Sequence, residues 1–292
     1  MARIPQQQLD LFIATASDVS PKSHQDLMAR NWFSLTKRKR TEPIFHQFQD
    51  NWVKITGSDE HGVATIFDND ILIFVIAQYV SAMNQGMKTG RRFQFTGYEY
   101  FKFIGKRKTG GKGYADLWNS LQRLHHTFVE TNIRLGSETK QHSFNWLSEI
   151  KQVKDGSTHR GYELVIPEWL YESITDKKMV LTLDEDYFNI RGGLERWLYL
   201  FARKTSGWQS GGWTESIESI YQKSSSMGSL SEFKRKLRNI ERKQSLLGYT
   251  METIEGRRGD GMYFLRRNEL IEMSSHSRGK ARRNGATEWR KS

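Results

Sequence analysis

Apolar side chains recur at helical spacing in two separate stretches of the chain, one near its middle and one near its C-terminal end. In each stretch the gaps between apolar positions are 3, 4 and 3 residues, which places these positions on one face of an α-helix. The pattern therefore predicts two amphipathic helices of the same kind, one carrying Tyr114, Leu117, Leu121 and Leu124 and the other carrying Leu230, Phe233, Leu237 and Ile240.

Two further helices are predicted ahead of each amphipathic helix. In the first half, the apolar run 71–77 follows the residues 68–70, which are of the types that favour helix N-termini, and Thr96 begins a second helix. In the second half, an aromatic-rich helix at 187–204 and a shorter one from Thr214 come in the same order, and Gly192-Gly193 are candidates for a break in the first turn of the former. The aromatic side chains of 187–201 are interpreted as core rather than as a platform for stacking bases.

The predicted helix starts repeat at a nearly constant distance along the chain. Starts at 71, 96 and 114 match starts at 188, 214 and 230, with offsets of 117, 118 and 116 residues. Alternating stretches separated by turn residues predict strands around these helices, at 52–55, 64–67, 127–135, 144–153, 162–166, 249–254 and 262–265.

Three helices followed by a β-hairpin, found twice, predict an α+β fold of two tandem winged-helix domains. Two segments flank them: an N-terminal arm with a basic run, and a C-terminal tail without periodicity that is expected to be disordered. The predicted boundaries are 1–45 for the arm, 46–175 and 176–273 for the two winged-helix domains, and 274–292 for the basic tail.

Charge adds a candidate partner to this picture. The chain has 292 residues, with 45 Lys and Arg against 33 Asp and Glu, which gives a net charge of +12. Four segments hold the positive excess, and the rest of the chain is net acidic: 37–40, 102–112, 230–243 and 274–292. Localised positive charge favours docking on a nucleic-acid duplex over binding to a membrane surface. The run 37–40 has two interpretations, a solvated loop or an anchor for the phosphate backbone.

Composition also excludes several kinds of chemistry. The chain contains no cysteine, so it has no disulfide, cysteine-ligated zinc, iron–sulfur cluster or thiol nucleophile. Its longest apolar run, 71–77, is too short for a membrane-spanning helix. We therefore expect a cytoplasmic protein with no membrane partner and no cofactor.

The helix from 230 carries the strongest candidate for DNA contact. Lys234, Arg238 and Arg242 follow one another at four-residue spacing on the side away from the apolar face. In helix-turn-helix proteins the second helix enters the major groove, where arginine reads guanine and asparagine reads adenine. The remaining candidates in this half flank the stripe, stand near the helix N-terminus for capping or phosphate contact, or occupy the hairpin tip: Arg235, Asn239, Ser229, Ser231, Arg257 and Arg258.

The first half carries its positive charge in a loop instead. Its third helix has only Arg123, with Asn119 and Gln122, on the exposed side. The glycine-rich loop before that helix is expected to contact phosphates without reading bases, or to be a solvated loop, and its candidate residues are Lys106, Arg107, Lys108 and Lys112. The spacing of its glycines and lysines does not fit a nucleotide-binding phosphate loop, so ATP binding there is rejected.

Candidates for metal binding and catalysis are few. Asp68, Asp70 and the acidic run 184–186 precede predicted helices and are interpreted as helix caps. His125 and His126 are adjacent, so they lie on different sides of a helix and do not form the His-x-His pair of replication nickases. We therefore predict a protein that is not an enzyme and holds no metal.

Several blocks of the chain resemble bacterial plasmid replication initiator proteins of the RepA type. These blocks are Gln25-Asp-Leu-Met-Ala-Arg-Asn-Trp-Phe-Ser-Leu-Thr-Lys-Arg-Lys-Arg40, Ala64-Thr-Ile-Phe-Asp-Asn-Asp-Ile-Leu-Ile73, Gly192-Gly-Leu-Glu-Arg-Trp-Leu-Tyr199 and the helix 229–243. Together, and in this order, they span about residues 9–270.

The resemblance implies a bacterial protein that binds repeated sites in double-stranded DNA at a plasmid origin to initiate replication and control copy number. It also implies help in opening an AT-rich segment, a possible homodimer, and contacts with the host replicative helicase and the host initiator. Initiators of this kind pair two winged-helix domains, and the recognition helix maps here to 230–243. The loop 105–113 is longer than the turn of a plain helix-turn-helix, which fits a supporting role for the first unit. The alternatives are a DNA-nicking replication or transposition enzyme and a winged-helix transcriptional repressor.

Overall fold

The fold is described from a computed structural model. The described residues are 11–14, 19–48, 50–106, 109–133, 141–155, 158–175, 179–207, 211–256 and 259–267. The chain divides into two compact units, each taken by itself below. Unit 1 consists of Met1–Asp26 and Thr36–Phe188, and unit 2 consists of Leu27–Leu35 and Asn189–Ser292.

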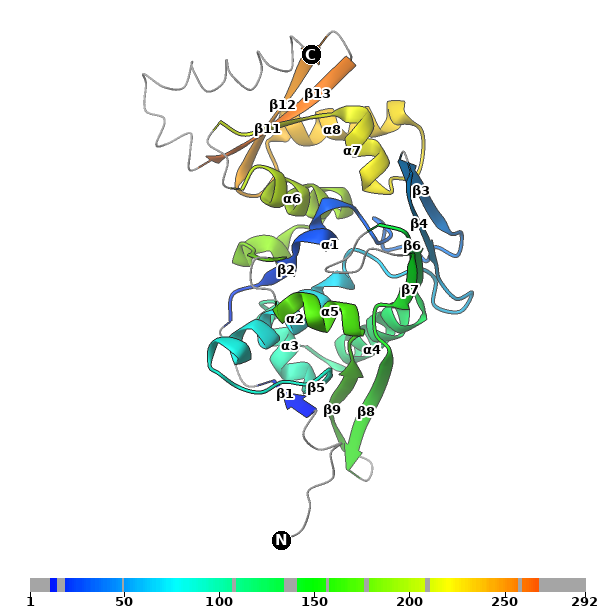
Figure 1. Cartoon of the computed structure of the whole chain (residues 1–292), viewed down its shortest axis with the longest axis vertical. Helices are drawn as coiled ribbons and strands as arrows, with labels where there is room; N and C mark the ends of the chain where they lie inside the picture. Colours follow the sequence, from blue (N-terminus) through cyan, green and yellow to red (C-terminus); the bar gives the residue numbers. More distant parts are fainter. Residues whose placement is uncertain are drawn as a thin grey trace. The chain divides into compact units, whose positions relative to one another are not determined.

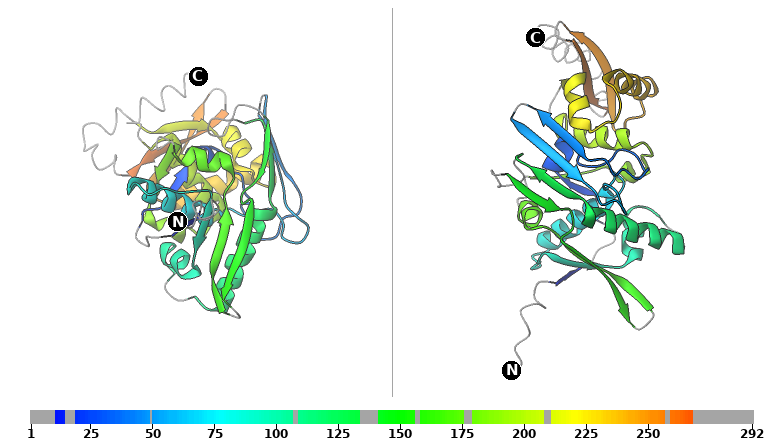
Figure 2. Two further views of the ribbon diagram at one scale, coloured as in Figure 1. Left: turned by 60° about the horizontal axis from the view of Figure 1, so that its bottom comes forward. Right: turned by 90° about the vertical axis from the view of Figure 1, so that its right-hand side faces the viewer.

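Unit 1 is built around a buried helix, α2 (Asn69–Asn84), which carries the apolar run predicted from the sequence. A strand and two helices follow it: β5 (Arg92–Phe95), α3 (Gly97–Phe103) and α4 (Gly111–His126). Two long strands, β8 (Glu149–Asp155) and β9 (Thr158–Val165), then form a hairpin. These two strands, together with β5 and β1 (Leu11–Ile13), make a sheet in the order β1-β5-β9-β8. The hairpin projects from the unit, and α4 lies beside it (Figures 1 and 2).

Aromatic side chains form the centre of unit 1. The Phe74 ring of α2 lies 5.1–5.8 Å from four other rings, those of Phe93, Phe95, Tyr100 and Phe103. A capping box fixes the start of helix α3, which carries Tyr100 and Phe103 of this cluster. In it the Thr96 side chain accepts from the Glu99 amide, and the Glu99 carboxylate accepts from the Thr96 amide. The predicted cap at Thr96 is therefore confirmed.

Unit 1 contains further elements outside this core. A second antiparallel sheet has the order β3-β4-β6-β7. Its strands are β3 (Ile44–Phe48), β4 (Asn51–Thr56), β6 (Phe128–Thr131) and β7 (His142–Asn145). The remaining elements are β2 (Lys22–His24), which pairs with β10 (Val180–Thr182), helix α5 (Glu168–Thr175), and helix α1 (Gln25–Ala29), within which the chain passes from unit 1 to unit 2.

Unit 2 repeats the order of helix, strand, two helices and hairpin, without the strands β6 and β7 that separate α4 from the hairpin in unit 1. After a 3₁₀ helix at Glu185–Asn189, which begins in unit 1, come α6 (Gly193–Thr205), β11 (Trp213–Ser216), α7 (Ile217–Ser224) and α8 (Leu230–Lys243). A hairpin of β12 (Tyr249–Gly256) and β13 (Gly259–Arg266) completes it. The sheet order is β11-β13-β12, so the strand after the first helix pairs with the last strand, as β5 pairs with β9 in unit 1.

The predicted repeat of three helices and a hairpin is thus present in both units, but three details of the prediction were wrong. Residues 64–67, predicted as a strand, form a turn. The predicted strand 144–153 is two strands, β7 and β8. The helix predicted to begin at Thr214 begins instead at Ile217, because Trp213–Ser216 form the strand β11. The helix predicted over 187–204 is interrupted at Gly192-Gly193, as expected from these glycines, and consists of a 3₁₀ helix followed by α6. The predicted core role of its aromatic residues is confirmed for Tyr187, Trp197, Tyr199 and Phe201, which are buried, whereas Phe188 is half-buried.

The segment Leu27–Leu35 is part of unit 2 although the chain enters unit 1 on both sides of it. Drawn in blue in Figure 1, it runs beside α6, and Trp32 and Phe33 are buried. A Cβ atom at Gly193 would stand 1.9 Å from the Leu35 carbonyl oxygen, so this close approach requires glycine at the start of α6. The domain boundaries predicted at 45, 175 and 273 are not tested by this division into compact units and stay predictions.

Candidate nucleic-acid interface

Helix α8 begins and packs as its sequence predicts. The Ser229 hydroxyl accepts from the Glu232 amide at 3.3 Å, and the Glu232 carboxylate accepts from the Ser229 amide at 3.1 Å. Phe233, Leu237 and Ile240 are buried against the unit, which fixes the side of α8 that faces the core. Ser229 therefore caps the helix, which is the first of the two roles predicted for it, and phosphate contact stays a prediction.

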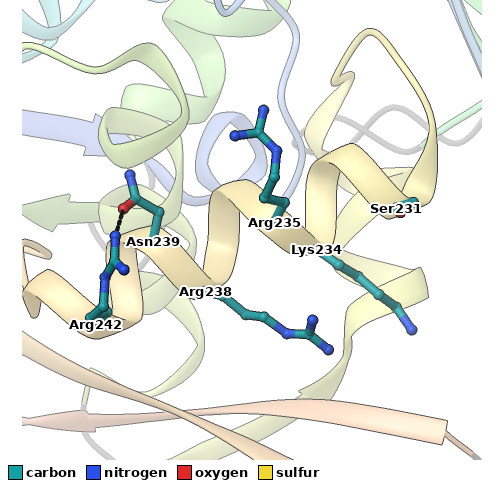
Figure 3. Close-up of a pocket in the computed structure, with 6 residues that line it drawn as sticks. All are labelled: Ser231, Lys234, Arg235, Arg238, Asn239 and Arg242. Atoms are coloured by element: carbon teal, nitrogen blue, oxygen red, sulfur yellow. Dashed lines mark hydrogen bonds between the residues drawn. The ribbon is translucent and has the colours of Figure 1, made fainter.

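The opposite side of α8 is a polar and basic surface. Figure 3 shows six residues of this helix lining one hollow: Ser231, Lys234, Arg235, Arg238, Asn239 and Arg242. We call this set the α8 basic face. All six were predicted DNA contacts, and five of them are exposed while Lys234 is half-buried. Because an α-helix has 3.6 residues per turn, the apolar and the basic residues of α8 lie on different sides, and no charged side chain has to be buried in the core.

Two side chains of the α8 basic face, those of Asn239 and Arg242, are joined by a hydrogen bond. One Arg242 guanidinium nitrogen donates to the Asn239 Oδ1 at 2.8 Å (Figure 3). This contact leaves the Asn239 amide nitrogen as an exposed donor. An asparagine side chain in this state still has the donor that contacts adenine N7 in the major groove.

Arg235 and Arg238 differ from this pair. Within the described residues, neither side chain has an ion-pair or hydrogen-bond partner, and both are exposed. Figure 3 shows them extending to different sides of the helix, with Arg238 on the same side as Lys234. An unpaired guanidinium retains its full set of donors for phosphate or guanine.

Lys234 has a role that the sequence did not indicate. Its ammonium lies 3.3 Å from the Asp260 carboxylate of β13, so it connects α8 to the hairpin. A second contact joins the same two elements, since the Glu241 carboxylate accepts from the Thr253 amide and hydroxyl of β12, both at 2.6 Å. These contacts fasten the β12–β13 hairpin to α8, so that helix and hairpin are presented together.

The structure does not test the predictions made for the hairpin tip and the tail. Arg257 and Arg258, predicted to contact DNA at the tip, lie outside the described residues. The basic tail, predicted to begin at 274, also lies outside them.

The basic loop of unit 1 is described except at residues 107 and 108. Lys106 and Lys112 are exposed, whereas Arg107 and Lys108 lie outside the described residues. No ion pair or hydrogen bond to the side chain of Lys106 or Lys112 is found within the described residues. Lys112 stands in the first turn of α4, where backbone amides also point outward.

Arg123, the basic residue noted on the exposed side of α4, is engaged in a structural contact. Its guanidinium donates twice to the Asp68 carboxylate, at 2.8 and 2.6 Å, and Asp68 is buried. The hydrogen bond to Asp68 raises the pKa of Arg123, against the lowering effect of burial. Asp68 also accepts from the Thr65 amide and hydroxyl.

Asp68 stands at the N-cap position of α2 and Asp70 in its first turn, as predicted, but the Asp68 side chain does not cap the helix. That side chain makes no capping bond to α2 and instead binds Thr65 and Arg123. The prediction holds for the other acidic run, since the Asp184 carboxylate accepts from the Asp186 amide at the start of the 3₁₀ helix.

The histidines of α4 make ordinary local contacts. The His125 ring nitrogen lies 2.9 Å from the Leu147 carbonyl oxygen, and that of His126 lies 2.9 Å from the Gln122 carbonyl oxygen. In the part of the chain that the structure describes, no group of three or more metal-binding side chains comes together. Among the same residues, no helix combines the length and apolar character needed to cross a membrane.

The basic run 37–40 is only partly free. The Lys37 ammonium lies 4.6 Å from the centre of the Phe67 ring, and the Arg40 guanidinium donates to the Glu42 and Pro43 carbonyl oxygens at 3.0 and 3.1 Å. Arg38 and Lys39 between them are exposed. Lys37 and Arg40 therefore make contacts within the protein, while the side chains of Arg38 and Lys39 are exposed to solvent.

Comparison with known proteins places the chain in a family. The family model described as Replication initiator protein A matches residues 22–251. A protein of Wigglesworthia glossinidia brevipalpis, named "Putative replication protein", is 35% identical over 247 residues, which is 83% of this chain and 88% of that protein. These matches define the class as replication initiators. The chain belongs to the replication initiator protein A family, and its role lies in the initiation of replication.

Two crystal structures of RctB share the fold. The first, of domains 2 and 3 of RctB, covers 84% of this chain and 98% of its own, with a TM-score of 0.59 at 15% identity. The second, of the same domains, covers 85% of this chain and 99% of its own, with a TM-score of 0.52 at 13% identity. The likeness extends over both compact units and supports the mixed α/β architecture described above.

Proposed function

We propose that the protein binds repeated sites in double-stranded DNA at a plasmid origin, and that it does so through two tandem winged-helix domains without enzymatic activity. The observation that carries the proposal is the α8 basic face, a helix with its apolar side buried and unpaired arginines on its exposed side. A helix of this kind, second in a helix-turn-helix, fits the major groove.

The order of elements supports the winged-helix assignment. In each unit a helix, a strand and two helices precede a hairpin, and the first strand pairs with the last. In unit 2 the Lys234–Asp260 and Glu241–Thr253 contacts fix the hairpin beside α8. A hairpin held in this way would reach the backbone or minor groove next to the groove that α8 enters.

The two units have different proposed roles. Unit 2 reads bases through α8, because arginine and asparagine side chains are exposed there. Unit 1 contacts phosphates through Lys106 of the loop before α4 and Lys112 in the first turn of α4, since Arg123 is occupied by Asp68. Contacts of this second kind set position and affinity but carry no sequence information.

The later steps of initiation are proposed from family membership. They comprise opening of an AT-rich segment, recruitment of the host helicase with the host initiator, control of copy number, and dimerisation. Repression of its own promoter would be compatible with the same DNA contacts, and a plasmid maintenance assay separates the two activities.

The direct test is a footprint over the DNA segment beside the protein's own coding region. We expect repeated protections at helical-turn spacing. A uniform pattern without protected repeats would refute sequence-specific binding. A parallel incubation with supercoiled plasmid and Mg²⁺ tests the alternative of a nicking enzyme, because nicked or covalently attached DNA would contradict a non-enzymatic initiator.

Arg238→Ala is expected to weaken specific binding by about 1–3 kcal/mol and to relax sequence preference, because the side chain is exposed, unpaired within the described residues and able to make a bidentate contact with guanine. The measurement is a titration of the protected duplex and of single-base variants of it. Affinity equal to wild type on the protected duplex would show that α8 is not the recognition helix.

Lys106→Ala in the unit 1 loop is expected to weaken binding of all duplexes alike and to reduce the salt slope of the affinity by about one. Removing one phosphate contact releases one counterion fewer, whatever the sequence. Titrations at several salt concentrations measure the slope, with exposed Lys88→Ala of the same unit as the control. An unchanged slope would remove this loop from the interface.

A further inference from the structure

We infer that Asn31, a residue of the N-terminal segment, positions the recognition helix α8 and so determines how well the protein distinguishes specific from non-specific DNA. The inference rests on the proposed function. It gives a role to the Arg-Asn-Trp-Phe segment, for which neither charge nor spacing indicated any function.

Asn31 is 2% exposed and makes five hydrogen bonds. Its backbone amide donates to the Lys223 carbonyl at 2.9 Å, and its carbonyl accepts from the Ser225 hydroxyl at 2.7 Å. Its side-chain nitrogen donates to the Ser224 and Phe33 carbonyls at 2.8 and 2.6 Å, and its side-chain oxygen accepts from the Phe33 amide at 3.2 Å. One buried residue thus satisfies groups on two segments that are far apart in the sequence.

The partners of Asn31 in unit 2 stand where α7 ends and the turn toward α8 begins. Ser225 is in the left-handed conformation, with φ of 59°, and closes α7. At the other end of the turn, the Tyr221 hydroxyl donates to the Gly228 carbonyl at 2.6 Å, and the Tyr221 ring lies 5.3 Å from that of Phe233 on α8. The turn is therefore held at its start by Asn31 and at its end by Tyr221.

The turn sets the direction in which α8 leaves α7. Without Asn31, the Ser224 and Phe33 carbonyls would lose their side-chain donor in a buried place, and the turn would gain conformational freedom. Base contacts need fixed geometry, whereas attraction of a basic helix to phosphates does not. Loss of Asn31 should therefore reduce specific binding more than non-specific binding.

The experiment compares full-length wild type with Asn31→Ala and Ser225→Ala. Ser225→Ala removes the hydroxyl that donates to the Asn31 carbonyl, leaves the Asn31 side chain in place, and serves as the milder variant. The matched control is Ser206→Ala, which removes a buried hydrogen bond to the Ala202 carbonyl at the end of α6, away from the turn. Each protein is titrated with the duplex protected in the footprint and with a scrambled duplex of the same composition, below its melting temperature, and amide exchange is measured for residues 224–232.

For Asn31→Ala we expect specific affinity to fall by about tenfold, non-specific affinity to change by less than about twofold, and amide exchange in the turn to accelerate. Ser225→Ala should change both readouts in the same direction and by less, and Ser206→Ala should change neither. The positioning role would be overturned if Asn31→Ala lowered the affinity for both duplexes equally. It would also be overturned if neither the ratio of specific to non-specific affinity nor the amide exchange of the turn changed. If wild type showed no preference between the duplexes while Asn31→Ala still loosened the turn, the DNA-binding proposal would fail and the role of Asn31 in holding the turn would stand.

Discussion

Replacement of Arg123 by alanine is expected to destabilise unit 1 by about 3–5 kcal/mol. The reason is the state of Asp68, whose side chain is 1% exposed and is paired with Arg123 through two hydrogen bonds. Truncation of the arginine leaves this carboxylate buried with only the two Thr65 donors. Urea unfolding followed by circular dichroism measures the loss, because the denaturation midpoint shifts with the free energy of unfolding.

Two further variants isolate the buried charge as the cause. Arg38→Ala removes an exposed arginine from the same unit and should change stability by no more than about 0.5 kcal/mol. In the double variant Asp68→Asn, Arg123→Ala, no charge is left buried, so part of the lost stability should return. If Arg123→Ala behaved like Arg38→Ala, the pair would contribute nothing to folding, and Arg123 would become a candidate for DNA contact.

The features predicted correctly are those that neighbouring residues determine. The apolar spacing of α8 and its cap at Ser229 lie within one stretch of chain, as do the cap at Thr96 and its partner Glu99. Each depends on residues three or four positions apart, which a helix brings together whatever the rest of the fold does. The residues of the α8 basic face could therefore be identified one by one from the amino-acid sequence alone.

The features that were missed depend on partners far along the chain. Asn31 binds Ser224, 193 positions away, and Asp68 binds Arg123, 55 positions away. The residues 68–70 match helix-capping preferences locally, yet the Asp68 carboxylate accepts its hydrogen bonds from Arg123 and Thr65 instead of from the amides of α2. Strands β5 and β11 are four residues long, too short for a periodicity of two to stand out, and are defined by pairing with β9 and β13.

A similar limit applies inside the candidate interface. Helical spacing places Lys234 and Arg238 on one stripe, and charge alone gives them the same role. The hairpin separates them, since Asp260 pairs with Lys234, whereas the Arg238 side chain has no partner among the described residues. If α8 binds DNA as proposed, Lys234 would have to leave Asp260 to take part, so Arg238 is the better single test of recognition.

Leu237→Ala is expected to destabilise unit 2 by about 2–5 kcal/mol, because the side chain is fully buried and its truncation leaves a cavity between α8 and the body of the unit. Thermal and urea unfolding measure the effect. DNA binding should fall only as the folded fraction falls, and excess protected duplex should raise the melting temperature again, since a ligand that binds only the folded state stabilises it by mass action.

The neighbouring position supplies the control for this variant. Arg238 follows Leu237 in the chain but is exposed, so Arg238→Ala should leave stability within about 0.5 kcal/mol of wild type while weakening specific binding. Adjacent residues of one helix would then separate folding from recognition, the first acting only through stability and the second only through affinity. A fully folded Leu237→Ala protein that bound DNA less tightly would contradict this division, because it would mean that the buried side of α8 also sets the geometry of the basic face.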